Sequence, residues 1–209
     1  MFGIVGYKMF LLSGILLNLT PGSDTIYILT RAGVGGRRKG IASALGISTG
    51  ILIHTVLAAL GLSVILASSA AAFNTMKFIG AAYLAVMGIK TIISKEGIMP
   101  SDGVQDENIM KVYRQGVLTN ALNPKVALFF LALLPQFVSP SNTYGPIPFL
   151  ILGFTFFCTG TLWCTFLAYI ASFVSNFLKK NDKVQKFASK ATGVIYILLG
   201  LNVLRAKIE

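Results

Sequence analysis

Apolar residues run along this chain in long stretches, and short clusters of polar and basic residues separate them. Residues 126–178 contain no Asp, Glu, Lys or Arg over 53 consecutive positions, and residues 40–76 contain none over 37. A helix that crosses the hydrocarbon core of a membrane needs about 20 mostly apolar residues. The longer stretch therefore has room for two crossings, and the pattern predicts an all-α integral membrane protein.

The polar clusters divide the chain into six predicted transmembrane helices. Proline breaks helix one at Pro21 and helix four at Pro124, because it lacks a backbone N–H and clashes with the carbonyl four residues earlier. We expect residues 1–209 to form a single transmembrane domain. The helices are predicted at about residues 8–30, 41–66, 75–93, 115–138, 149–173 and 191–204.

The composition agrees with this prediction, since 55% of the residues are hydrophobic and 12% are charged. Soluble domains carry roughly 25% charged residues, so a soluble enzyme, a nucleic-acid-binding domain and a disordered chain are excluded. The net charge of +11 comes mainly from basic clusters at the ends of apolar stretches. Such clusters orient helices and attract anionic lipid headgroups, so the expected partner is the lipid bilayer and not a nucleic acid.

Basic residues gather in three of the connecting segments. Cytoplasmic loops carry the excess of Lys and Arg, so residues 31–40, 94–114 and 176–190 are predicted to be cytoplasmic. With six crossings, both termini are then predicted to lie outside.

The two halves of the chain resemble each other. Repeat one covers about residues 1–95 and repeat two about residues 115–209, with the loop 94–114 between them. Because each repeat has three helices, the two repeats are expected to be inverted, as in alternating-access transporters whose site lies near the midplane. The matching motifs are Gly14-x3-Asn18-x2-Pro21 with Gly116-x3-Asn120-x3-Pro124, and Lys77-x2-Gly80-x2-Tyr83 with Lys190-x2-Gly193-x2-Tyr196.

The two proline-interrupted segments are the candidate binding site. A broken helix frees backbone groups, which are costly in hydrocarbon unless protein, water or substrate satisfies them. A kink that neighbouring helices stabilise is the alternative. The candidate substrate-binding residues are Asn18, Pro21, Gly22, Asp24, Asn120, Asn123, Pro124 and Lys125.

Three titratable residues, Asp24, His54 and Lys125, lie well inside the predicted helices. A charge at the centre of a membrane helix costs about 2.5–3.5 kcal/mol on insertion scales. Asp24 and Lys125 form either a structural ion pair or a pair that binds the ammonium and the carboxylate of a zwitterion. Asp24 and His54 are the candidates for proton coupling, since imidazoles can titrate near physiological pH; a neutral His54 that is hydrogen-bonded within the bundle is the alternative.

The sequence contains no motif for a cofactor or a metal. Cys158 and Cys164 are separated by about 600° around a helix at 100° per residue, so we interpret them as small apolar residues that do not bond to each other. Gly46-x3-Gly50 permits close helix packing. This packing can occur within one chain or between two, so a homodimer stays open as an alternative.

In these motifs the chain resembles the lysine-exporter (LysE/RhtB-type) family of bacterial amino-acid efflux proteins. The similarity covers nearly the whole chain, although the family usually has Pro-Gly-Pro where this chain has Pro21-Gly22-Ser23. That difference leaves the geometry of the first half-site open. The matching residues are 19–25 (LTPGSDT), 35–40 (GGRRKG) and 44–46 (ALG) with His54 downstream, and then 123–130 (NPKVALFF) and 134–137 (LPQF).

The resemblance implies a secondary active transporter, not an enzyme. It would export amino acids or closely related zwitterionic metabolites across the bacterial inner membrane, driven by the proton or ion gradient. A divalent-cation exporter of the same superfamily would need clustered carboxylates, thiols or imidazoles inside the membrane. An intramembrane thiol carrier would need juxtaposed thiols. The sequence leaves the identity of the amino acid open.

Overall fold

The computed structural model describes residues 2–62 and 108–181, together with isolated positions between residues 75 and 93 and between residues 183 and 201; the side chains of residue 34 and residues 172–180 are not described. Within these residues the chain is helical, and its β-structure is limited to an isolated bridge between Ile4 and Val138. Several expectations lie outside the described residues. They concern Lys77, Gly80, Tyr83, Gly193, Tyr196 and most of the loop 94–114.

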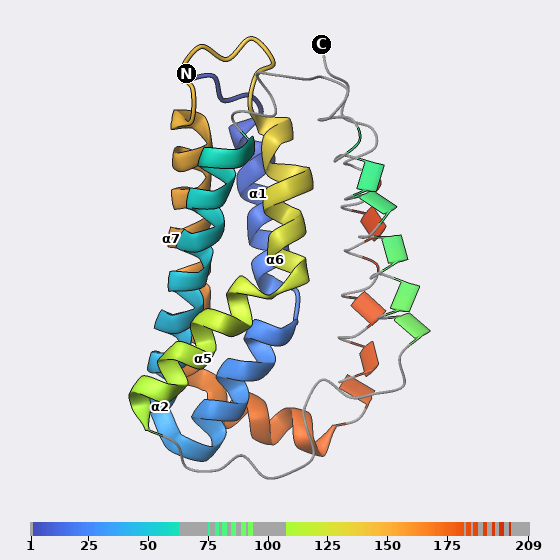
Figure 1. Ribbon diagram of the computed structural model, residues 1–209. Coiled ribbons are helices and arrows are strands. Elements are labelled where there is room, and N and C mark those ends of the chain that lie inside the picture. The colour runs from blue at the N-terminus through green and yellow to red at the C-terminus, as the bar shows by residue number, and fades with distance from the viewer. Residues whose placement is uncertain are drawn as a thin grey trace.

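The described helices form an upright bundle (Figure 1). Helix α1 covers Tyr7–Leu19 and α2 covers Ser23–Leu57, which continues into the π-helical turn Ala58–Leu62. Helix α5 covers Ile109–Ala121 and α6 covers Pro124–Leu128. A π-helical turn (Phe129–Leu133) and a 3-10 turn (Leu134–Phe137) follow α6, and α7 covers Ile147–Lys180.

Helix α2 consists of two arms that meet at Gly36, where φ is 70° and ψ is −172°. Glycine adopts a positive φ at little cost because it has no Cβ. In Figure 1 the first arm descends in blue and the second arm rises in cyan. Residues 31–40, expected as an open basic loop, are therefore the ends of two helical arms joined at one residue. The fifth predicted helix, at about residues 149–173, is likewise longer in the structure, where α7 extends to Lys180.

Two of the described helices are long and apolar enough to cross a membrane, namely Gly35–Gly61 and Ile147–Ala171. The pair Ile109–Ala121 and Pro124–Phe137 makes a third candidate if it is counted as one span, with a bend of 43° between its parts. Helix α1 is apolar but shorter. Large apolar side chains on the outer faces are exposed, including Val56 on α2 and Leu162 on α7, as expected for surfaces that contact lipid.

Two larger apolar clusters fill most of the interior, and a small third one joins Leu29 and Ala32 to Ala171. One contains phenylalanine rings from α1, α7 and the turns after α6, with the centroids of Phe129 and Phe156 only 4.4 Å apart. The other joins Ile28 and Ile47 of α2 to Leu167 of α7. Polar side chains are buried where the two clusters meet, and this is where the candidate site lies.

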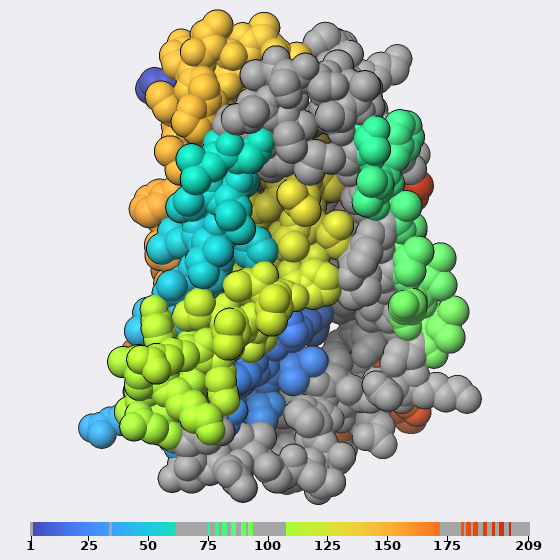
Figure 2. Space-filling model, in the orientation of Figure 1, coloured from blue at the N-terminus to red at the C-terminus, as the bar shows by residue number. Residues whose placement is uncertain are grey.

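Helices α2 and α5 lie against each other (Figure 2), and glycines allow this close contact. A Cβ added at Gly46 would overlap the carbonyl oxygen of Tyr113, and one added at Gly116 would lie 2.9 Å from the carbonyl oxygen of Ser43. Gly50 lies against the side chain of Asn120. The Gly46-x3-Gly50 motif thus packs against α5 of the same chain, and this contact presents Asn120 to α2.

Candidate functional site

The chain leaves helical geometry between α1 and α2 at residues 20–22. Thr20 is extended, with φ −69° and ψ 119°, as expected for a residue before proline. Gly22 is also extended and precedes the first turn of α2, which carries Asp24. The end of α1 is partly closed by Thr20, whose backbone N–H and hydroxyl both donate to the carbonyl of Leu16.

A second interruption separates α5 from α6. Asn123 is extended, with φ −73° and ψ 110°, and its side-chain oxygen accepts a hydrogen bond of 3.0 Å from the backbone N–H of Lys125. Pro124 occupies the first position of α6, where its missing N–H would have no helical partner in any case. Asn123 is therefore an N-cap, and α6 starts in a new direction.

The side chain of Lys125 reaches back from α6 to the end of α1. Its Nζ donates to the carbonyl oxygen of Leu17 at 3.1 Å and to that of Thr20 at 2.9 Å. Lys125 is 7% exposed. The last carbonyls of a helix lack intrahelical donors and carry partial negative charge, so the ammonium satisfies and neutralises this end of α1.

Asp24 is held by a different group. Its Oδ2 accepts a hydrogen bond of 2.8 Å from the amide of Asn120, which is fully buried. The backbone carbonyl of Asn120 accepts one of 3.1 Å from Nε2 of His54, whose ring stacks on Phe130. Within the described residues no ion pair of 4.0 Å or less joins Asp24 to Lys125. In this conformation each charge is therefore held by neutral groups.

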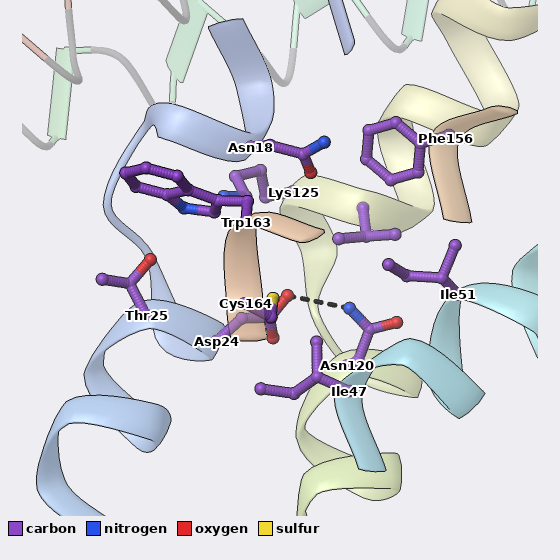
Figure 3. Close-up of a pocket in the computed structure, with 11 residues that line it drawn as sticks. Asn18, Asp24, Thr25, Ile47, Ile51, Asn120, Lys125, Phe156, Trp163 and Cys164 are labelled. Carbon is purple, nitrogen blue, oxygen red and sulfur yellow. Dashed lines mark hydrogen bonds between the residues drawn. The ribbon is translucent and has the colours of Figure 1, made fainter. Parts of the chain in front are cut away.

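Asp24 and Lys125 nevertheless share one cavity, into which both point (Figure 3). The cavity is narrow and admits only water-sized molecules in this conformation. It lies near the middle of the two long spans, since Ile47 and Ile51 are central in Gly35–Gly61 and Phe156 and Cys164 flank the centre of Ile147–Ala171. The lining residues are Asn18, Asp24, Thr25, Ile47, Ile51, Asn120, Lys125, Val126, Phe156, Trp163 and Cys164.

Several polar atoms at this cavity are buried without a partner among the described residues. They are Oδ1 of Asp24, Oδ1 of Asn120 and Nε1 of Trp163. An unsatisfied buried group costs about 1–3 kcal/mol. Two acceptors and one donor of this kind around one hollow provide binding capacity for a polar molecule.

The structure places the predicted site residues in three positions. Asn18, Asp24, Asn120 and Lys125 line the cavity. Pro21, Gly22, Asn123 and Pro124 form the two interruptions beside it, and His54 lies behind Asn120.

Sequence reasoning missed the contribution of α7. Trp163 and Cys164 line the cavity, and Thr159 accepts a hydrogen bond of 3.3 Å from the amide of Asn18. The sequence pattern indicates only small apolar packing residues at both cysteine positions. The only tryptophan of the chain stands among hydroxyl residues in the part of α7 before Lys179, which carries no charge, and it was the available signal.

The described residues offer little for a metal ion or a disulfide. They contain no group of three or more His, Cys, Asp or Glu side chains that could hold a metal. Cys158 and Cys164 are both free thiols. The polar side chains that line the cavity are Asn18, Asp24, Thr25, Asn120 and Lys125, together with the indole of Trp163.

A bundle with an apolar exterior, broken helices and charged groups at mid-depth has the features of a membrane transporter. Residues 15–207 match the family model for LysE type translocators. The chain belongs to this family, which confirms the resemblance inferred from its motifs.

Relatives match over nearly the whole chain. An uncharacterized membrane protein of Bacillus subtilis is 33% identical over 90% of this chain and 92% of its own length. A homoserine/homoserine lactone efflux protein of Salmonella typhimurium is 32% identical over 95% of both chains. A leucine efflux protein of an Enterobacter strain is 26% identical over 94% of this chain and 93% of its own length. No solved structure matches significantly.

Proposed function

We propose that this protein exports neutral amino acids or closely related zwitterions from the bacterial cytoplasm across the inner membrane. The observation that carries the proposal is the unpartnered, buried Oδ1 of Asp24 in a cavity that also contains the ammonium of Lys125. The family and the printed names of the relatives, which include homoserine and leucine efflux proteins, support the same class of cargo.

The two ends of a zwitterion find complementary groups. The substrate's ammonium binds Oδ1 of Asp24 and Oδ1 of Asn120, both of which accept hydrogen bonds. The carbonyls of Leu17 and Thr20 occupy two N–H donors of Lys125. The substrate's carboxylate binds the third donor and the indole N–H of Trp163. An ammonium has three donors, so this binding does not displace the contact between Lys125 and α1.

The rest of the cavity selects the side chain of the substrate. Its wall includes the apolar residues Ile47, Ile51, Val126 and Phe156. A basic amino acid would need a second carboxylate, and Asp24 is the only one among the described lining residues. An acidic amino acid would need a second cation. The composition of the lining therefore favours aliphatic or hydroxylated side chains.

Transport on this proposal requires the cavity to widen and to open alternately to the two sides. Two inverted repeats, at about residues 1–95 and 115–209, rock against each other, and residues 31–40, 94–114 and 176–190 face the cytoplasm. Proton coupling uses Asp24, with His54 connected to it through Asn120. Inverted repeats with a midplane site are a recurring basis of alternating access.

Counterflow in proteoliposomes tests the proposal. Proteoliposomes that contain wild-type protein and are loaded with unlabelled leucine or homoserine should accumulate the same compound in labelled form. Lysine and glutamate should not exchange. Asp24→Asn keeps the size of the side chain and removes its charge, so it should abolish exchange while the protein stays folded. Ser23→Ala, at an exposed neighbouring position, is the matched control and should exchange like wild type.

Cys164 gives an independent binding assay. In a Cys158→Ser background, bound substrate should slow the reaction of Cys164 with a small methanethiosulfonate, because Cys164 lines the cavity. Absence of saturable exchange for every neutral amino acid tested, together with unprotected labelling in folded protein, would overturn the proposal.

A further inference from the structure

One residue connects the two helix interruptions. The backbone of Lys125 lies in the first turn of α6, directly after the second interruption, and its ammonium binds the carbonyls of Leu17 and Thr20 at the first. The side chain runs along Gly22, where an added Cβ would lie 3.4 Å from Nζ and 3.5 Å from Cε. Gly22 thus leaves the space that the lysine needs to reach α1.

The charge of this lysine acts at the end of α1 and not on its own five-residue helix. A cation opposes the macrodipole at a helix N-terminus and is stabilised by it at a C-terminus. Lys125 is the second residue of α6, yet its Nζ lies at the C-terminal end of α1. The charge is therefore placed where α1 benefits from it.

Among the described residues no carboxylate contacts this ammonium directly, and the ammonium is shielded from bulk water. Lys125 is buried, and its cavity is lined by two other ionisable groups, Asp24 and Cys164. In the part of the chain that the structure describes, no carboxylate lies within 4.0 Å of Nζ. The acceptors that hold the charge are backbone carbonyls.

Carbonyls at the C-terminal end of a half-helix coordinate the coupling cation in many transporters with broken helices. We infer that Lys125 is a tethered monovalent cation that occupies such a position at the end of α1, in place of an exchangeable sodium ion. Its ammonium keeps the two interruptions together, and the protein works without sodium. The statement about transport rests on the proposed function, whereas the occupancy of the carbonyl site does not.

Chemical complementation tests the occupancy without any transport assay. Lys125→Ala removes the ammonium and leaves a space beside the carbonyls of Leu17 and Thr20. We expect this variant to unfold at a lower temperature than wild type in detergent with choline chloride. Ethylammonium chloride should raise the unfolding temperature of this variant by several degrees, and the rise should saturate with concentration. Wild type should not respond, because its own ammonium fills the site.

Leu152→Ala is the matched control for this experiment. Leu152 is fully buried in the apolar core, so its truncation opens a space of similar size without free carbonyls. It should be destabilised and should not respond to ethylammonium. The inference is wrong if Lys125→Ala does not respond, if Leu152→Ala responds equally, or if sodium in place of choline stabilises the wild-type protein.

A second variant covers the case in which Lys125→Ala does not fold. Lys125→Gln keeps a long side chain with N–H donors but lacks the charge, so its unfolding temperature should also fall below that of wild type. An unchanged unfolding temperature would show that the charge is not needed and would overturn the inference.

The transport consequence has its own readout. Counterflow by wild type should be equal in sodium and in choline buffers, and a requirement for sodium would contradict the inference. If wild type exchanges no amino acid while ethylammonium stabilises only Lys125→Ala, the inference stands and the proposed function fails.

Discussion

Gly50 makes room for the residue that holds Asp24, so Gly50→Ala should disturb the site without adding a polar group. An added Cβ would lie 2.6 Å from Cβ and 2.7 Å from Oδ1 of Asn120. Ordinary carbon contacts are about 3.5–4.0 Å, so the side chain of Asn120 must retreat by about 1 Å. Its hydrogen bond to Asp24 is 2.8 Å long and is lost at about 3.6 Å or more.

The expected cost follows from these two effects. Overpacking a tight interior costs about 1–3 kcal/mol, and losing a hydrogen bond to a charged group costs about 1.5–3 kcal/mol. Because both arise from one displacement, we expect about 2–4 kcal/mol in total, and not the full sum. For a chain of this length, 1 kcal/mol corresponds to a shift of about 2–4 °C, so the unfolding temperature should fall by roughly 4–16 °C.

The assay is thermal unfolding in detergent together with counterflow of labelled leucine per folded molecule. Gly50→Ala should lower both, since Asp24 loses the group that orients it. Gly61→Ala is the matched control, because a Cβ added there meets nothing within 4 Å, and it should behave like wild type. A Gly50→Ala protein with wild-type unfolding temperature and exchange would refute the proposed role of Asn120.

Three further variants test the packing that surrounds the site. Asn108→Ala removes the side chain that caps α5; it should cost about 1 kcal/mol and leave exchange per folded molecule unchanged, and a loss of exchange would contradict a purely structural cap. Thr161→Val removes the 2.9 Å hydrogen bond to Ser48 that links α7 to α2; about 0.6 kcal/mol is expected from interhelical bonds of this kind, and a much larger drop in unfolding temperature would count against that value. Leu152→Ala should cost about 2–5 kcal/mol through the cavity it leaves, and an unfolding temperature equal to wild type would show that Leu152 is not part of a tight core.

The sequence located the charged chemistry because it stands out against an apolar background. A carboxylate and an ammonium inside uncharged stretches have few explanations other than a shared polar interior. Asp24 and Lys125 do line one cavity. The hydrogen-bond partners of Lys125 were not predictable from the sequence. They are backbone carbonyls, which every residue has.

Other features lacked a sequence signal for different reasons. Helix α7 carries no charge before Lys179, so its signal is limited to the tryptophan among hydroxyl residues, and nothing in the pattern marks Cys164. The cluster of Gly and Arg at residues 31–39 predicts a basic loop, where the structure has a turn at Gly36. A single positive φ is enough to reverse the chain, and glycine content alone does not reveal which residue adopts it.

Asp24 and Lys125 each link the segment 2–62 to the segment 108–181 at this cavity, and the two links differ in what can replace them. Lys125 bonds to carbonyls of α1. Because its ammonium is tethered beside them, the ammonium of a free amino acid does not displace it. Asn120 bonds to Asp24 through a neutral amide, and a substrate ammonium is the stronger donor for a carboxylate. A hydrogen bond to a charged group contributes about 1.5–3 kcal/mol, and a differential affinity of about 1.4 kcal/mol shifts a two-state equilibrium tenfold. On the proposed mechanism, a substrate ammonium bound at Oδ1 of Asp24 competes with the amide of Asn120 for the carboxylate. It thereby weakens this one link between α2 and α5, while the link through Lys125 keeps the two interruptions together.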